Sequence, residues 1–328
     1  MEKISVLMSV YNETSEMLIQ SIESILGQDY KNIEFVIVLD NPENALAREI
    51  LHQYIKSDQR IILIENEINQ GLANSLNIAL KQATGTIVAR MDADDISMPT
   101  RLSEEIACLY EGNYDVVFTG KMDIDGNGNI IDCRPIKSSN KDYIKSVLKY
   151  NCIINHPSVM IRTRVLKSAC GYRNFYCSQD YDLWLRLLSN HSSFGCIQKP
   201  LLLYRIRTES ITGKNRLLQF ETTRYIKKLF RAREKKGRDS YSWEHYNAYL
   251  KRHHVFDKKS QQRFNQAYTS YIESMQLRKI KDYPNAIRKL GSSLKGFCWV
   301  SIMIHNTFNE KRLDAYYKSA GNNSFPFG

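Results

Sequence analysis

Short apolar runs alternate with amphipathic segments through the first 120 residues, and this alternation limits the choice of fold more than any other feature of the chain. Residues 4–10 and 33–39 are almost continuously apolar, which is typical of strands buried on both faces of a parallel sheet. The segments between such runs carry apolar residues at helical spacing, as at Leu18, Ile22 and Ile25. The pattern predicts strands at 4–10, 33–39, 60–65, 86–91 and 114–119, and helices at 14–27, 43–57, 72–83 and 99–111. This order is typical of a doubly wound, mostly parallel α/β sheet.

The order changes after residue 120. A hairpin turn is expected at 125–129, where the sequence reads Asp-Gly-Asn-Gly-Asn, and a helix is expected at 141–149. Another helix begins near Ser178, and a strand follows at 201–206. From about residue 214 the pattern is helical, over 214–238, 241–255 and 261–296. We therefore expect an α/β domain at 1–212 and a basic helical C-terminal region at 213–328.

Charge is divided unevenly between these two parts. The net charge is +11, yet residues 1–198 carry 19 Lys and Arg against 25 Asp and Glu, whereas residues 199–328 carry 27 against 10. The basic end is expected to face nucleic acid, a membrane surface or a phosphorylated substrate. No apolar run approaches the roughly 18–20 residues of a membrane-spanning helix, and no signal-peptide pattern is present at residues 1–30. The seven cysteines form no C-x-x-C pair, so free thiols of a cytoplasmic protein are expected.

Polar side chains gather where the predicted strands end. Tyr11 and Asn12 follow the first strand, Asp40 follows the second, and Asp92 and Asp94 follow the fourth. In an open parallel sheet, ligands bind outside the carboxyl ends of the strands. Carboxylates this close together repel one another, and a divalent cation with oxygen ligands would compensate them. The alternative is a solvated acidic turn that caps the next helix. No glycine-rich phosphate loop of the P-loop or dinucleotide-binding type is present.

Asp180 stands at the start of a predicted helix with Leu183, Trp184 and Leu187 on its buried face. An acid in this position is often only a helix cap, stabilised by the helix dipole. A carboxylate can also take a proton from an attacking hydroxyl group. The residue type alone leaves both roles open.

Four segments together resemble the family-2 glycosyltransferases of the GT-A fold. They are ISVLMSVYN at 4–12, NQGLANSLN at 69–77, ARMDADDISMPTRL at 89–102 and DYDLWLRL at 180–187. The third is typical of bacterial capsule, O-antigen and exopolysaccharide transferases, and the opening strand is similar to amylovoran-type enzymes. The resemblance covers about residues 3–210, and its strength lies in the order and spacing of the four segments.

The resemblance implies a role for each matching residue. Tyr11 would stack on the nucleotide base, Asp40 would bind the base edge, and Asp180 would be the general base. Asp92 would contact the ribose or the metal, and Asp94 would bind a Mn²⁺ or Mg²⁺ ion that bridges the diphosphate. Further candidates are Asn12, Asn69 and Arg90 for the nucleotide sugar, and His156, Trp184, Arg205 and Arg207 for the acceptor or its phosphate. Residues 1–120 would then form the nucleotide-sugar half and residues 121–212 the acceptor half.

Three positions depart from the family pattern. The second strand ends Asp40-Asn41-Pro42, where D-D-G-S is commoner, so Asp40 alone remains to bind the base. Gln179 replaces a Glu before the proposed base, which removes a neighbouring charge. Arg207 stands where many relatives have His, and an arginine there could bind phosphate directly.

These implications predict an inverting, metal-dependent glycosyltransferase of bacterial surface polysaccharide synthesis. It would move a hexose or N-acetylhexosamine from a UDP-sugar to a glycan acceptor such as a sugar on polyprenyl diphosphate, with a β linkage. The helical region would bind the inner face of the plasma membrane or form a homodimer. Two alternatives are a sugar nucleotidyltransferase on a related sheet and a nucleic-acid-binding protein that uses the basic tail. The acidic body and the absence of a nucleic-acid motif argue against the latter.

Overall fold

The computed structural model describes residues 2–134, 136, 138–206, 215–293 and 297–319. Its first part is a four-stranded parallel sheet in the order β3 (Ile61–Glu65), β2 (Ile33–Leu39), β1 (Ile4–Val10) and β4 (Ile87–Arg90). All four were predicted within one residue at either end. Their carboxyl ends lie at one edge, where the acidic loop after β4 begins.

The rest of the sheet is mixed rather than parallel. β8 (Val159–Arg162) lies between β4 and β6 (Val116–Ile124) and is antiparallel to both, while β9 (Phe194–Arg205) is parallel to β6. The two-residue strand β5 (Ile96–Ser97) and the hairpin strand β7 (Ile130–Arg134) are antiparallel additions. The expectation of a mostly parallel sheet therefore holds for the first half and needs correction for the second.

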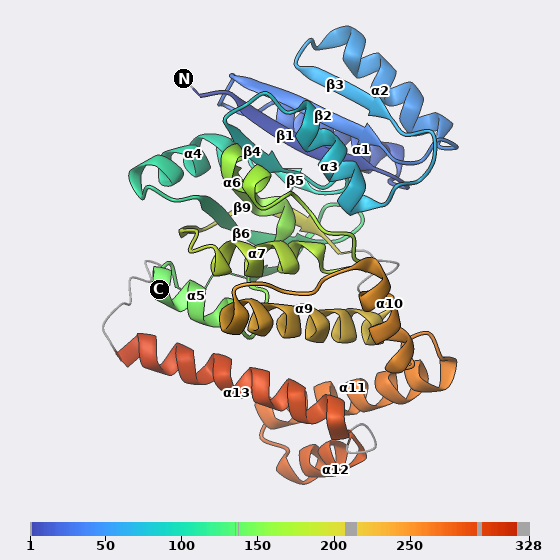
Figure 1. Cartoon of the computed structure of the whole chain (residues 1–328), viewed down its shortest axis with the longest axis vertical. Helices are drawn as coiled ribbons and strands as arrows, with labels where there is room; N and C mark the ends of the chain where they lie inside the picture. Colours follow the sequence, from blue (N-terminus) through green and yellow to red (C-terminus); the bar gives the residue numbers. More distant parts are fainter. Residues whose placement is uncertain (1, 135, 137, 207–214, 294–296, 320–328) are drawn as a thin grey trace.

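Helices cover both faces of the sheet (Figure 1). Alternate residues of β2 face opposite ways: Phe35, Ile37 and Leu39 join one core cluster, and Val36 and Val38 join the other. Continuous apolar strands are required because both faces are buried. The helices of the α/β part are α1 (Ser15–Leu26), α2 (Ala45–Ser57), α3 (Leu72–Gln82), α4 (Arg101–Glu111), α5 (Lys141–Leu148), α6 (Thr163–Ser168) and α7 (Gln179–Ser189), with a 3-10 turn at His156–Ser158.

Five helices make up the C-terminal region: α9 (Arg216–Lys236), α10 (Trp243–Arg252), α11 (Lys258–Lys279), α12 (Tyr283–Ser293) and α13 (Phe297–Ser319). α9 lies directly against α7 (Figure 1), and its Ile226, Leu229 and Phe230 share one hydrophobic core with Trp184 and Leu187 of α7. The α/β part and the C-terminal helices thus share one hydrophobic core. α13 is joined to the α/β part by the Tyr143 hydroxyl, which donates to Asp314 Oδ1 at 2.7 Å.

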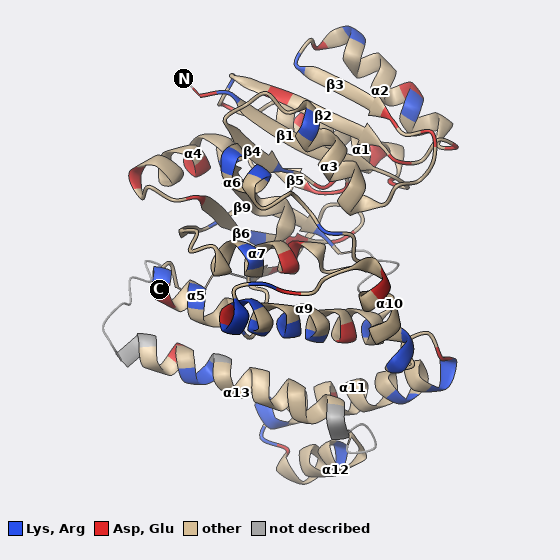
Figure 2. Ribbon diagram, viewed as in Figure 1, with Lys and Arg blue, Asp and Glu red and all other residues tan. Residues whose placement is uncertain are grey.

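Part of the apolar run at 297–304 packs inside the helical region. Within it, Val300 is buried against Ala267 and Tyr271 of α11, and Trp299 meets the Phe264 ring edge-on at 5.2 Å. Among the described residues, no helix combines the length and apolarity needed to cross a bilayer. Figure 2 shows Lys and Arg along α9, at the turn between α10 and α11, and near the connection between α11 and α12.

Candidate active site

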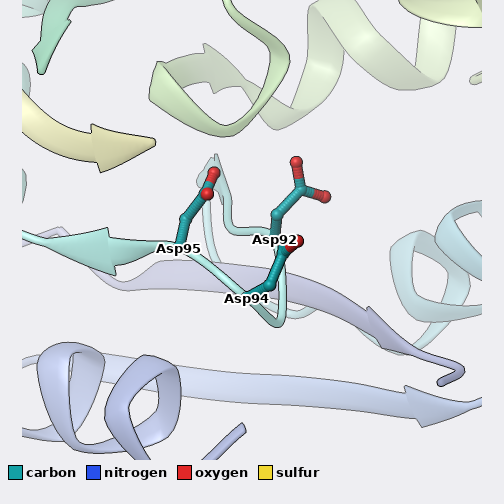
Figure 3. Close-up of side chains that lie close together, drawn as sticks. All are labelled: Asp92, Asp94 and Asp95. Atoms are coloured by element: carbon teal, nitrogen blue, oxygen red, sulfur yellow. The ribbon is translucent and has the colours of Figure 1, made fainter. Parts of the chain in front are cut away.

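Three carboxylates lie together in the loop that follows β4. Asp92, Asp94 and Asp95 each place a carboxylate oxygen within 4.8 Å of the others, and Figure 3 shows the Asp92 and Asp95 groups turned to the same side of the loop. Asp95 is 1% exposed, and its Oδ2 has no hydrogen-bond partner among the described residues. Burial, followed by the charges of Asp92 and Asp94, raises the pKa of Asp95 well above its usual value. A divalent cation with oxygen ligands fits this set, because it would compensate the repulsion and the unpartnered oxygen.

Arg90, the last residue of β4, is the cation nearest to this loop in sequence. It is 2% exposed and forms an ion pair with Asp92, yet its Nε and Nη1 have no hydrogen-bond partner among the described residues. Buried guanidinium donors without acceptors are costly. These two nitrogens could bind an anionic group of a ligand beside the carboxylates, as the sequence led us to expect for a nucleotide-sugar contact.

Arg205 occupies a different place from the one expected. Its guanidinium donates to the backbone oxygens of Asp94 (2.8 Å), Asp125 (3.0 Å) and Gly126 (2.8 Å) and to Gln20 Oε1 (2.8 Å). Its backbone N–H donates to Asp95 Oδ1 at 2.8 Å. The side chain is 4% exposed. Arg205 therefore positions the acidic loop rather than binding acceptor phosphate, and Arg207 lies outside the described residues.

Asp180 is half-buried in the first turn of α7, after Ser178 in a left-handed conformation with φ of 59°. Burial raises the pKa of Asp180 to about 6, and the negative charge of Asp92 acts in the same direction. These effects outweigh the backbone N–H groups of Asp180 and Tyr181, which favour the ionised form. The carboxylate is thus suited to gain a proton near neutral pH, and it lies within electrostatic reach of the acidic loop.

Asp182, two residues further along α7, has a different environment. It is fully buried, and its Oδ2 accepts from Arg186 Nε at 2.7 Å, while Arg173 lies 3.7 Å from its Oδ1. Arg173 also pairs with Asp239 at 2.9 Å, and Asp239 pairs in turn with Arg233 of α9. This chain of ion pairs, which we call the α7–α9 network, holds α7 against α9. Of the two acids, Asp182 is engaged in ion pairs, whereas Asp180 is partly exposed.

His156 and Trp184 lie side by side beneath the site. His156 is 9% exposed, its Nε2 is 2.9 Å from the Tyr172 hydroxyl, and its ring meets the Trp184 ring edge-on at 6.1 Å. Burial and the nearby Arg90 hold the pKa of His156 well below its usual value, so the imidazole is neutral. Trp184 is 1% exposed and belongs to the core. The expectation that Trp184 contacts the acceptor is therefore corrected, because its ring is covered by protein.

At the other end of the site, Tyr11 is 43% exposed after β1, which leaves its ring free to stack on a base. The Asn12 Oδ1 accepts from Asn41 at 2.7 Å, and the exposed Asn69 accepts from the Gly71 N–H at 2.8 Å. Asn12 therefore shapes the loop after β1, and Asn69 shapes the turn before α3.

Asp40 was expected to bind the base edge, yet it is 2% exposed. Its oxygens accept from Asn66 Nδ2 (2.7 Å), the Gln70 N–H (2.7 Å) and the Gly71 N–H (2.8 Å). The carboxylate thus holds the turn before α3, where Gly71 has a φ of +78°.

Tyr204 is a site residue that the sequence reasoning missed. Burial raises the pKa of Tyr204, and the charges of Asp92, Asp95, Asp94 and Asp180 act in the same direction. Lys121 lies 3.7 Å from the centre of its ring. The one available signal was its position near the end of a predicted strand, beside Arg205.

The model of glycosyl transferase family 2 matches residues 5–168. The chain belongs to this family. The O-antigen biosynthesis glycosyltransferase WbnJ of Escherichia coli is 32% identical to this glycosyltransferase over 232 residues, which cover 70% of this chain and 89% of WbnJ. The UDP-Glc:alpha-D-GlcNAc-diphosphoundecaprenol beta-1,3-glucosyltransferase WfgD, also of E. coli, is 31% identical over 195 residues, covering 59% of this chain and 73% of WfgD.

The crystal structure of S. aureus TarS 1–349 in complex with UDP-GlcNAc resembles this glycosyltransferase with a TM-score of 0.59. The sequences are 18% identical, and the match covers 97% of this chain and 92% of the TarS chain. The likeness confirms the GT-A fold, including a helical region after the α/β part.

Proposed function

We propose that this glycosyltransferase is inverting and metal-dependent, and that it moves a hexose or N-acetylhexosamine from a UDP-sugar to a glycan acceptor. The observation that carries the proposal is the pairing of the Asp92, Asp94 and Asp95 cluster with Asp180, whose pKa responds to the charge of Asp92. The three carboxylates are suited to bind a cation, and Asp180 is suited to accept a proton. An attack on the anomeric carbon needs both functions.

In the proposed reaction, the acceptor hydroxyl oxygen forms a bond to the anomeric carbon of the donor sugar. The bond from that carbon to the β-phosphate oxygen breaks, and its electron pair leaves with UDP. Asp180 takes the proton of the hydroxyl group, so that the nucleophile gains electron density as it attacks. A single displacement of this kind inverts the configuration, so a β linkage follows from an α-linked donor.

Asp92, Asp94 and Asp95 would hold the Mn²⁺ or Mg²⁺ ion. When bound, the ion would supply positive charge to stabilise the departing diphosphate. Arg90, with two unpartnered buried nitrogens, would add a fixed positive charge beside it. Arg205 would keep the acidic loop in place through its bond to the Asp94 backbone oxygen.

The names of the relatives support the proposed substrates. WfgD is named for transfer from UDP-Glc to a sugar on diphosphoundecaprenol, and WbnJ for O-antigen synthesis. TarS was crystallised with UDP-GlcNAc. We therefore propose a UDP-sugar donor, a sugar-diphosphate-polyprenol acceptor and a role in surface polysaccharide synthesis at the inner face of the plasma membrane.

A transfer assay tests this proposal. The protein is incubated with a panel of UDP-, GDP- and dTDP-sugars and a sugar-diphosphate-polyprenol acceptor, and products are identified by mass spectrometry. We expect product from one UDP-sugar in the presence of Mn²⁺ or Mg²⁺. Formation of UTP and a sugar 1-phosphate from the UDP-sugar when pyrophosphate is added would instead indicate a nucleotidyltransferase. Failure to bind UDP under any metal condition would contradict the proposal.

The α11–α12 corner suits the proposed contact with a membrane. Ile280, Tyr283 and Ile287 are 73%, 56% and 71% exposed, and exposed basic residues surround them at Arg278, Lys279, Lys281 and Arg288. Apolar side chains among basic ones fit an anionic lipid surface, since the first can enter the interface while the second meet the headgroups. We name these three apolar residues the corner patch.

Replacing Ile280 and Ile287 by aspartate is expected to lower binding to vesicles with about one quarter phosphatidylglycerol by at least ~10-fold per substitution, because each change removes apolar contact and adds repulsion. Vesicle sedimentation measures the effect. Ile130→Asp is the matched control, since Ile130 is 63% exposed on β7 outside the corner patch. Equal loss in the control, or no loss in the corner variants, would contradict membrane contact at this corner.

A further inference from the structure

A cavity of about 220 Å³ lies where the α/β part meets the C-terminal helices. Asp180 and Cys152 line it from the α/β side. Gln219, Thr223 and Lys227 line it from α9, and Asn306 from α13. The proposed general base thus lines the same cavity as residues of α9 and α13. Both helices lie outside residues 5–168, which the family model matches.

The lining suits a sugar. Amide and hydroxyl groups from Gln219, Thr223 and Asn306 can both donate and accept, as sugar hydroxyl groups require. Tyr150 and Tyr181 add aromatic walls. The volume leaves room for about one sugar ring, in keeping with a small, polar and specific site.

Lys227 is the unusual member of this lining. It is 8% exposed and its Nζ donates to the Tyr150 backbone oxygen. The ion pairs of the described part of α9 involve Arg224 and Arg233 and not Lys227. Burial, with a smaller effect of Arg231, lowers its pKa to about 8. A buried cation without an anionic partner is costly unless a ligand supplies the missing charge.

We propose that this cavity is the acceptor subsite, that α9 and α13 close it, and that it takes a sugar ring carrying an anionic group, which Lys227 binds. The proposal rests on the proposed function, because it assumes that the hydroxyl group facing Asp180 is the nucleophile. The anionic group is a phosphate or a carboxylate. A phosphate on the anomeric oxygen would come from the lipid-linked sugar itself, whereas a carboxylate would come from a uronic acid unit of the glycan.

Binding of small probes tests the subsite without requiring transfer. N-acetylglucosamine 1-phosphate, glucuronic acid and methyl glucoside are titrated into the protein with UDP and diamagnetic Mg²⁺ present, and their binding is followed by saturation-transfer NMR. We expect one of the two anionic probes to bind at least ~10-fold more tightly than methyl glucoside, which identifies the source of the charge. Equal affinity for all three probes would overturn the proposal.

Lys227→Met should abolish this preference, and Lys227→Arg should retain part of it. Lys228→Met is the matched control, because Lys228 is the next residue of α9 and is exposed. UDP binding and the melting temperature show that each variant is folded. An equal effect of the Lys228 and Lys227 substitutions would mean that general surface charge is responsible, and would overturn the role of Lys227.

A second pair of variants tests the cavity independently of the lysine. Cys152→Phe should fill the cavity with its larger side chain and prevent probe binding. Cys152→Ser keeps the side-chain size and should leave probe binding unchanged. Retained probe binding in Cys152→Phe would place the acceptor elsewhere. UDP binding by the wild-type protein is measured as well. A wild-type protein that does not bind UDP would contradict the proposed function. A wild-type protein that binds UDP but shows no preference for the anionic probes would contradict only the proposed acceptor subsite.

Discussion

Asp180→Asn is expected to lower kcat by about 10³-fold while UDP-sugar binding is unchanged. Asparagine has nearly the same shape as aspartate but cannot take the proton of the acceptor hydroxyl. Asp180 is half-buried and lies outside the acidic loop, so the donor site is left intact. Steady-state kinetics with a lipid-linked acceptor, together with calorimetry of UDP binding, measures the two effects separately.

Asp182→Asn is the control for this change, because it makes the same substitution two residues away. It breaks the buried pair with Arg186 and should destabilise the fold by about 3 kcal/mol. Asp180→Asn should not lower the melting temperature at pH 7, since the ionised carboxylate is disfavoured in the folded state. The cost of the ionised Asp180 carboxylate to folding stability is absent at pH values below the pKa of the unfolded state. It is complete at pH values above the folded-state pKa of about 6. A kcat for Asp180→Asn within about tenfold of the wild type would exclude Asp180 as the base.

The pH profile gives a further readout for Asp180. Because its pKa is raised to about 6, kcat/KM should fall as the pH is lowered through about 6. An aspartate with its ordinary pKa would keep the profile flat down to about pH 4. A flat profile to that pH would show that the reacting base is not the half-buried Asp180.

Removing the metal is expected to have the second large effect. Chelation with EDTA, or Asp94→Asn, should lower transfer by at least ~100-fold, because no cation would remain to stabilise the departing diphosphate. Mn²⁺ titration followed by electron paramagnetic resonance should show tight binding in the wild type with UDP, and weak binding in Asp94→Asn. Transfer that survives EDTA would contradict the metal role and leave the transfer itself intact.

Thermal unfolding supplies the control for this variant. The Asp92, Asp94 and Asp95 oxygens lie within 4.8 Å of one another, so Asp94→Asn removes repulsion and should not lower the melting temperature without metal. Mn²⁺ with UDP should raise the melting temperature of the wild type but not of the variant. Glu49→Gln, which changes an exposed carboxylate on α2, should behave as the wild type in both measurements.

The parallel half of the sheet could be predicted from sequence, and the other half could not, for a physical reason. β1 and β2 are buried on both faces, so their residues are apolar apart from Ser5, Ser9 and Glu34. β6 and β9 continue well beyond the predicted strands through Gly120, Lys121 and Pro200, where the pairing register shifts. β8 has only four residues, too few for a periodic signal.

In the candidate site, too, the features that the sequence marks could be predicted, and those that depend on tertiary packing could not. Asp92, Asp94 and Asp180 could be proposed because they follow strand and helix boundaries that the sequence marks. The burial of Arg205 and Trp184 could not be foreseen, since it depends on which elements pack over them. Lys227 was one of many basic residues in the helical region, and only the tertiary contact between α9 and α7 gives it a place beside Asp180.

The α7–α9 network bears on how such an enzyme can diversify. The helix that carries the proposed base is tied through Arg173, Asp239 and Arg233 to the C-terminal region, so a graft of foreign C-terminal helices would leave Asp182 and its partners mismatched. New acceptor preferences would then arise more readily by single replacements on the cavity-facing side of α9 than by exchange of whole modules. For protein engineering, a chimaera cut at residue 212 is a poor starting point, and a library confined to positions 219, 223 and 227 is a better one.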